Sequence, residues 1–442
     1  MNPPSVYELT IPTSQRSIRT TAMVHNIGIP LVRLQSVSNS RIVPCHGLAP
    51  PARFDRRNRA GKLCRQRHFL VTQFGQCHQR VTSGDFNLHE SRAARAEACL
   101  AQLMKEYYRE ALMNADPNVS PQEGSADNLW AIVLAGGEGT RLAPVTRLLY
   151  GCDLPKQFAF LDGDRSLLQQ TMERISPLVP PHRTIVVVAK NRRQMAEVQL
   201  GRYRGVQIVS QPANAGTGPG VLLPLSLIKA QCPKAMVLVT PSDHHIPVPA
   251  RFLAAARLAA TTVQHAPSGL VVLGAEADQP DADLGWIVPD DPVVTSEVDL
   301  VGLFVEKPLA RVARELFRKG GLWNTMVVLG TVESLWRQAG RHMPDHIALF
   351  NRYVDELAKS GGRPGATADG LLVQLYRSMR QADFSRSILQ RARGTAVVKL
   401  KGSGWCDCGT PQRLLACLGE AIGRGRKQAL KAALNSMIAI PT

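Results

Sequence analysis

The sequence predicts an α/β protein with a mostly parallel sheet and helices on both faces. From about residue 128, short apolar runs rich in β-branched residues alternate with longer helical stretches, which is typical of parallel sheets. A glycine-rich turn, residues 136–139, directly follows the first of these runs. Ligands of such folds bind beyond the carboxyl ends of the strands, so this turn is the first candidate for a binding site.

The N-terminal part has a different character. Residues 1–90 show little periodicity and hold a basic cluster between Arg53 and Arg67, which predicts a disordered basic extension. A solvated tail is favoured over an RNA contact for this cluster, and the nearby cysteines and histidines match no zinc module. Residues 91–127 are expected to form a helix, over 91–113, followed by a polar linker.

Apolar periodicity places the remaining elements in chain order. We expect strands over residues 129–135, 185–189, 206–210, 235–240, 270–274, 301–306, 322–329 and 395–400. We expect helices over residues 166–175, 221–231, 250–265, 310–319, 332–341, 345–359, 370–382 and 411–422. Residues 128–423 then form one domain, and residues 424–442 a basic C-terminal tail.

Composition excludes several classes of protein. Hydrophobic residues make up 44% of the 442 residues and charged residues 20%, as in soluble globular proteins. The sequence contains no apolar run of the ~18 residues that a membrane span needs, so a membrane is not an expected partner. The N-terminus lacks a secretory apolar region. The nine cysteines have no disulfide-scaffold spacing, which predicts reduced cysteines and a cytoplasmic location.

The net charge of +18 raises nucleic acid as a partner. The basic residues are spread through the chain, however, and no zinc-finger, helix-turn-helix or RNA-binding signature accompanies them. Small polyanionic substrates also require local positive charge. Nucleic acid is therefore the less favoured partner.

The stretch after the first strand carries the features of a phosphate site. Glycines permit a tight turn whose backbone N–H groups can cradle phosphate oxygens, and Arg141 and Lys156 add positive charge. An ordinary turn after a strand is the alternative, and the spacing is neither that of a P-loop nor that of a dinucleotide fingerprint. The expected nucleotide-binding residues of this stretch are Leu134, Ala135, Gly136, Gly137, Gly139 and Thr140.

Asp243 follows another expected strand, over residues 235–240. A carboxylate there can hold Mg²⁺, an ion that prefers oxygen ligands and bridges substrate phosphates. A helix cap is the alternative role for Asp243, and His244 is assigned a structural role rather than that of a base.

Six segments, in order, resemble motifs of sugar-phosphate nucleotidyltransferases. The ending PKQF points to the mannose-1-phosphate guanylyltransferase branch, and the longer loop before it, with the GWI segment, to a divergent bacterial subgroup. The segments are LAGGEGTRL with PKQF (134–142 and 155–158), QPANAGTGP (211–219), PSDH (241–244), EKP (306–308), WNT (323–325) and GWCDCG (404–409).

The resemblance implies a Rossmann-like fold of the nucleotide-diphospho-sugar transferase type and a set of roles. Asp243 and Asp407 would hold Mg²⁺, with zinc at the flanking cysteines as the disfavoured alternative. Lys307 would hold the sugar phosphate. Further roles fall to Glu306, Asn324 and Gly285 at the sugar, and to Gln211, Asn214 and Thr217 near the base.

Several positions depart from the family pattern. Gln211 replaces an acid, and Met326 stands where a glycine usually follows the WN[ST] motif. These changes surround the base and the sugar rather than phosphate and metal, so they affect specificity more than reaction type.

The sequence thus predicts an enzyme that binds a nucleoside triphosphate and a sugar-1-phosphate. Arg141, Lys156, Asp243 and Lys307 are the expected catalytic residues. GTP and mannose-1-phosphate are the favoured substrates. The enzyme would release pyrophosphate and form a nucleotide sugar. The alternative is a regulatory or binding protein on a degenerate nucleotidyltransferase domain. A homodimer is the candidate assembly.

Overall fold

The computed structural model describes residues 128–161, 164–290 and 296–418. The chain divides into two units, residues 1–78 and 79–442, and every described residue belongs to the second. The predictions for residues 1–127 and for the tail 424–442 therefore lie outside the described residues.

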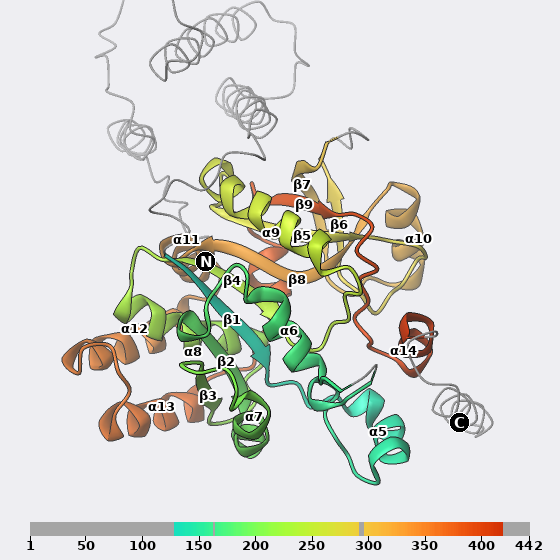
Figure 1. The fold of residues 1–442 in the computed structure, drawn as a ribbon. Coiled ribbons are helices and arrows are strands. Elements are labelled where there is room, and N and C mark those ends of the chain that lie inside the picture. The colour runs from blue at the N-terminus through green and yellow to red at the C-terminus, as the bar shows by residue number, and fades with distance from the viewer. Residues whose placement is uncertain (1–127, 162–163, 291–295, 419–442) are drawn as a thin grey trace, which may run out of the picture. The chain divides into compact units, whose positions relative to one another are not determined.

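Nine strands of the described part form one sheet (Figure 1). In sheet order they are β3 (Gln207–Gln211), β2 (Thr184–Ala189), β1 (Leu129–Ala135), β4 (Met236–Pro241), β8 (Leu322–Thr331), β5 (Leu270–Glu276), β9 (Ala396–Leu400), β7 (Val298–Val305) and β6 (Trp286–Pro289).

The α/β class is confirmed, but the sheet is mixed rather than mostly parallel as expected. Strands β3, β2, β1 and β4 are parallel, as are β5 and β9. Strand β8 runs antiparallel to both β4 and β5, and β6 and β7 also pair antiparallel. Strands buried on both faces read as continuous apolar runs, and such runs do not reveal direction.

Alternating residues of β1 enter two separate cores, as the period of a strand requires. Ala131 and Val133 belong to one core, and Trp130 and Ile132 to the other. Helices α6 (Leu167–Ile175), α7 (Arg193–Leu200), α9 (Pro249–Thr262) and α10 (Ala310–Arg318) pack into the first core. Helices α8 (Thr217–Gln231), α11 (Val332–His342), α12 (Pro344–Lys359) and α13 (Ala366–Ser378) pack into the second.

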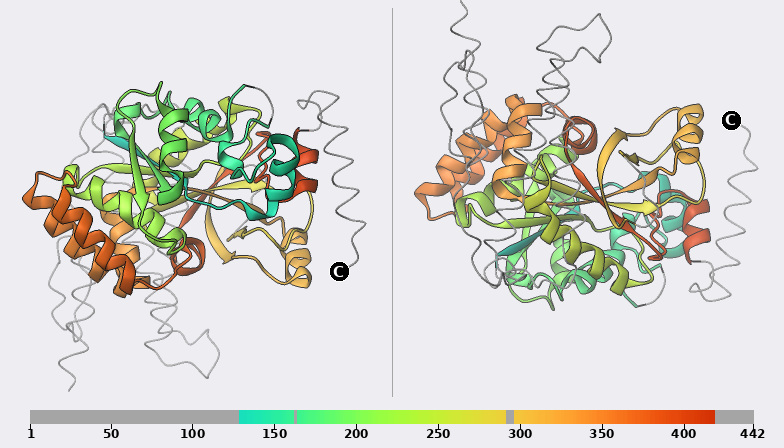
Figure 2. Two further views of the ribbon diagram at one scale, coloured as in Figure 1. Left: turned by 90° about the horizontal axis from the view of Figure 1, so that it is seen from below. Right: turned by 90° about the horizontal axis from the view of Figure 1, so that it is seen from above.

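A third, smaller cluster joins two distant parts of the sequence. Helix α5 (Ala143–Tyr150) contributes Val145, and helix α14 (Pro411–Leu418) contributes Leu414. In both views of Figure 2 the red helix α14 lies beside the teal helix α5. Helices α5 and α7 were not expected from the sequence. Among the described helices, none is both long enough and apolar enough to cross a bilayer.

Candidate active site

A cavity of about 490 Å³ opens where β1 and β4 end and β8 begins. Most of the expected site residues line it, although they come from many separate segments. They are Leu134, Gly136, Gly137, Arg141, Lys156, Gln211, Asn214, Thr217, Asp243, Gly285, Glu306, Lys307, Asn324 and Asp407. Three expected residues do not line it: Ala135 is buried at the end of β1, and Gly139 and Thr140 line an adjoining hollow of about 170 Å³.

The glycine turn is tied to the segment that follows it. Gln157 Nε2 donates to the carbonyl oxygens of Ala135 at 2.9 Å and Gly137 at 2.8 Å. Gly139 has a φ of 65°, and a Cβ on it would lie 3.0 Å from the backbone nitrogen of Lys156. A glycine is therefore needed for this close approach. The role of Gln157 was not anticipated, because a glutamine in a loop carries no signal by itself.

Lys156 is 9% exposed and bridges the two acidic segments. Its Nζ lies 3.0 Å from Asp243 Oδ2 and donates to the Asp407 carbonyl oxygen at 2.6 Å. Burial would raise the pKa of Asp243, but the charge of Lys156 and its hydrogen bond to the carboxylate outweigh burial, and the pKa is lowered. Asp243 is thus a carboxylate at neutral pH.

His244 is neutral in this site. Burial lowers its pKa to about 4, and its Nδ1 accepts a hydrogen bond from Trp405 Nε1 at 3.1 Å. A histidine of such a low pKa is a weak base, which agrees with the structural role expected for it.

Asp407 lies in the loop after β9 and is 7% exposed. Its carboxylate meets Arg413 of α14, with Nη2 at 3.0 Å from Oδ2 and Nε at 2.9 Å from Oδ1. Arg413 Nη1 also donates a hydrogen bond to Asp281 Oδ2. The contact at Oδ1 is an ion pair without hydrogen-bond geometry, and this buried oxygen accepts no hydrogen bond from the described residues. Neither Arg413 nor Asp281 was expected from the sequence.

The opposite wall carries Glu306, Lys307 and Asn324. Lys307 follows β7 with a φ of 48°, a conformation that is uncommon outside glycine. Burial, with the charge of Asp383, raises the pKa of Glu306. Its Oε2 is buried, and none of the described residues donates to it. A Cβ on Gly285 would lie 2.4 Å from that oxygen, so a glycine keeps this space open.

Gln211, Asn214 and Thr217 occupy the remaining side of the cavity. Gln211 ends β3 and accepts a hydrogen bond from the Tyr376 hydroxyl at 3.3 Å. Asn214 Oδ1 accepts from the Gly216 nitrogen at 3.1 Å. Thr217 begins α8, and its hydroxyl oxygen accepts a hydrogen bond from the Phe384 nitrogen at 2.9 Å.

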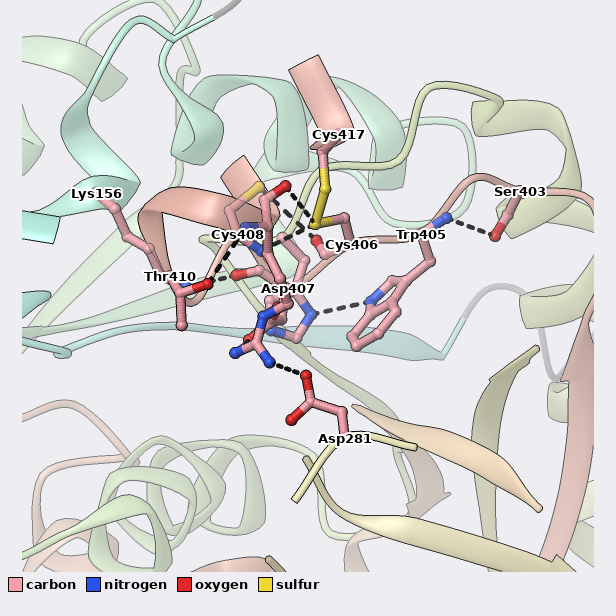
Figure 3. The surroundings of a disulfide bond; sticks show 11 residues. Lys156, Asp281, Ser403, Trp405, Cys406, Asp407, Cys408, Thr410 and Cys417 are labelled. Atoms are coloured by element: carbon pink, nitrogen blue, oxygen red, sulfur yellow. Dashed lines mark hydrogen bonds and ion pairs between the residues drawn. A yellow bond between two sulfur atoms is a disulfide. The ribbon is translucent and has the colours of Figure 1, made fainter. Parts of the chain in front are cut away.

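The expectation of reduced cysteines is wrong for one pair. Cys406 and Cys417 form a disulfide (Figure 3), because the loop after β9 returns along α14 and brings their Cα atoms to 6.3 Å. The sulfur of Cys408 lies within 4.8 Å of both, and burial raises the pKa of its thiol to about 12. The three sulfurs thus lie close together, and two of them form the disulfide.

Comparison with known proteins gives consistent relatives. The chain is 29% identical over 286 residues to the alginate biosynthesis protein AlgA of Pseudomonas fluorescens, covering 63% of this chain and 56% of that protein. It is 28% identical to the mannose-1-phosphate guanylyltransferase of Escherichia coli K12, covering 64% and 58%. The chain thus spans less than two thirds of the length of these relatives.

A solved structure has a similar fold. It is described as a mannose-1-phosphate geranyltransferase from Thermus thermophilus, with 26% identity, a TM-score of 0.57, and coverage of 66% of this chain and 80% of that chain. The family described as nucleotidyl transferase matches residues 130–420, and this chain belongs to that family.

Proposed function

We propose that the chain transfers a nucleoside monophosphate from a nucleoside triphosphate to a sugar-1-phosphate, releasing pyrophosphate and forming a nucleotide sugar. One observation carries the proposal: a single cavity holds the cations Arg141 and Lys156 on one side and Glu306, Lys307 and Asn324 on the other. GTP and mannose-1-phosphate are the favoured substrates, because the Escherichia coli relative is named for that pair.

The reaction joins a phosphate oxygen of the sugar phosphate to the α-phosphorus of the nucleotide. The bond from that phosphorus to the bridging oxygen breaks, and the electron pair leaves with pyrophosphate. The nucleophile is already an anion near neutral pH, so the site needs no strong base. Positioning and charge neutralisation supply most of the rate, with Arg141 and Lys156 at the triphosphate and Lys307 at the attacking phosphate.

Mg²⁺ is the proposed cofactor, and Asp243 and Asp407 are its proposed ligands. Two carboxylates from distant segments line one cavity, and Asp407 Oδ1 is buried with no hydrogen bond from the described residues. Such an oxygen suits a cation that prefers oxygen ligands. When bound, Mg²⁺ would offset the negative charge of the triphosphate.

We propose two further subsites along the walls of the cavity, one for the sugar and one for the base. Glu306 Oε2 is buried without a donor, and a sugar hydroxyl would supply one. Asn324 and Gly285 would complete this subsite. The proposed base subsite holds Gln211, Asn214 and Thr217, with the glycine turn at the phosphates. We also propose that residues 128–423 form the catalytic domain.

A panel of nucleoside triphosphates against sugar-1-phosphates, read as pyrophosphate release with Mg²⁺, tests the proposal. GTP with mannose-1-phosphate should give the fastest release. Release by another pair would change the named substrates but keep the reaction. Nucleotide binding without release by any pair would favour the regulatory alternative. The cytoplasmic location and the homodimer stay predictions.

A further inference from the structure

Arg413 occupies an unusual place beside the cavity. Its side chain is 13% exposed, and its guanidinium lies between the carboxylates of Asp281 and Asp407. Buried charges require partners, and the planar guanidinium can hold a carboxylate at two points. Two atoms of Arg413 face the two oxygens of Asp407, so the ion pair fixes the rotation of that carboxylate as well as its position.

Asp407 Oδ1 is the oxygen that we assign to the cation, although Arg413 Nε lies 2.9 Å from it. Only the Nη2–Oδ2 contact has hydrogen-bond geometry, whereas Oδ1 is buried and accepts no hydrogen bond within the described residues. Groups that bond the ligands of a metal orient those ligands, and their loss weakens metal binding. Arg413 has the geometry of such a group.

The space for this ion pair depends on a missing side chain. A Cβ on Gly409 would lie 2.1 Å from Asp407 Oδ2 and 2.5 Å from Arg413 Nη2. Neither atom could stay where it is beside any larger residue. The glycine therefore allows the guanidinium and the carboxylate to meet.

The backbone around the ion pair is fixed at both ends. Thr410 Oγ1 accepts from the Arg413 nitrogen at 3.2 Å at the start of α14. The disulfide between Cys406 and Cys417 closes a ring that contains both Asp407 and Arg413 (Figure 3). Helix α14 thus presents Arg413 to Asp407 from a position that the covalent ring restricts.

We infer that Arg413 is a positioning residue, which holds the Asp407 carboxylate in the orientation that binds the divalent cation. The inference rests on the proposed function for the identity of the site. Arg413 does not line the cavity and acts through Asp407, and Asp281 holds the other edge of its guanidinium.

The test measures Mn²⁺ binding to the full-length protein by electron paramagnetic resonance, without substrates. Arg413→Met should raise the Kd for Mn²⁺ about tenfold or more. Arg413→Lys keeps the charge but loses the planar fork, and its Kd should lie between the two. Arg314→Met, an exposed position on α10, is the control and should bind Mn²⁺ as the wild type does. Thermal unfolding followed by circular dichroism checks that each variant is folded. If Arg413→Met does not fold, the Kd of Arg413→Lys decides the test.

A double-mutant cycle separates positioning from a general effect on structure. In an Asp407→Asn background, Arg413→Met should cause no further loss of Mn²⁺ affinity, because the carboxylate that it orients is gone. An unchanged or tighter Kd in Arg413→Met would overturn the inference, as would the absence of Mn²⁺ binding by the wild type. Failure of the proposed function would show instead as no pyrophosphate release with any substrate pair, whatever the Mn²⁺ affinity.

Discussion

Lys156 has the most constrained position among the cations of the cavity. Its ammonium contacts Asp243 and the Asp407 carbonyl oxygen at once, so it links the two proposed metal ligands. The residues around it come from three distant segments of the chain. A single side chain can therefore affect both the triphosphate charge and the geometry of the acidic pair.

Replacing Lys156 by Ala should lower kcat about 100- to 1,000-fold, as the loss of one group that stabilises developing charge does elsewhere. The reason is that no other cation of the described residues takes its place between the acidic segments. Pyrophosphate release measures the effect. Lys190→Ala, at an exposed position, is the matched control. Wild-type turnover in Lys156→Ala would remove Lys156 from the mechanism.

Glu306 predicts a pH dependence of sugar-phosphate binding. Because burial raises its pKa, Glu306 takes up a proton at higher pH than an ordinary glutamate. The protonated form accepts hydroxyl hydrogen bonds poorly, so KM for the sugar phosphate should rise as pH falls from neutral. The substrate phosphate titrates as well, and Glu306→Gln isolates the protein's share. An identical pH profile of KM in that variant would contradict the assignment.

Met326 is one of the departures from the family pattern, and its backbone conformation is unusual for a methionine. Its φ is 56°, in the left-handed region that glycine adopts without steric cost. The structure therefore keeps the backbone of a glycine position although the residue is Met. The sequence showed the substitution but could not show the retained conformation, which lies at the register shift between β8 and β5.

This conformation predicts an inverted order of stability. Met326→Gly should be more stable than Met326→Ala by about 1–2 kcal/mol, because both lose the side chain beyond Cβ and only Ala keeps the steric cost of positive φ. Elsewhere in a strand the order is reversed. Urea unfolding of the two variants gives the difference. A more stable Ala variant would show that the left-handed conformation is not populated.

Strand β8 shows what the pattern of a sequence can and cannot specify. Its apolar run predicted a strand over 322–329, close to the observed bounds. Neither its direction nor the register shift opposite Val272 and Gly274 was visible, because both depend on partners far away in sequence. That irregularity lies beside Asn324, as bulges near active sites often do. The motif resemblance thus located Asn324, whereas the direction of β8, which carries it, depends on pairing with distant strands.

Helix α14 illustrates a second limit. Its start was expected at residue 411, as observed, and Asp407 came from a motif. Arg413 and Asp281 lie 132 residues apart, and no local pattern links them. Long-range ion pairs of this kind become visible only when the chain is folded.

The disulfide between Cys406 and Cys417 predicts a change in stability. Cys417→Ser should lower the free energy of unfolding by about 2–4 kcal/mol, since the closed ring restricts the unfolded chain. Thermal and urea unfolding measure it. The exposed free cysteine Cys152 gives the control variant, Cys152→Ser, which should change little. Equal stability of Cys417→Ser and the wild type would show that the bond does not form in solution.

The hydrophobic cores of the described part of the chain are built from residues of that part. The cores contain residues from Leu129 near the start of β1 to Leu414 in α14, and the family match covers nearly the same span, 130–420. The acidic and basic groups of the cavity all come from this span. The described residues thus hold both the cores and the groups proposed for the reaction, so we expect residues 128–442 to fold and to act on their own.

A shortened chain of residues 128–442 should fold and release pyrophosphate with kcat within a few-fold of the full-length protein. The reason is that β1 pairs with β2 and β4 of the same unit, so the shortened chain keeps every partner that the structure describes for its first strand. Circular dichroism and substrate turnover measure the two properties. RNA binding by both chains is measured across a salt series. If the basic N-terminal residues bind nucleic acid, residues 1–442 should show a steeply salt-dependent affinity and the shortened chain should not. An unfolded shortened chain would place the N-terminal residues in the catalytic unit, against the domain boundary at 128.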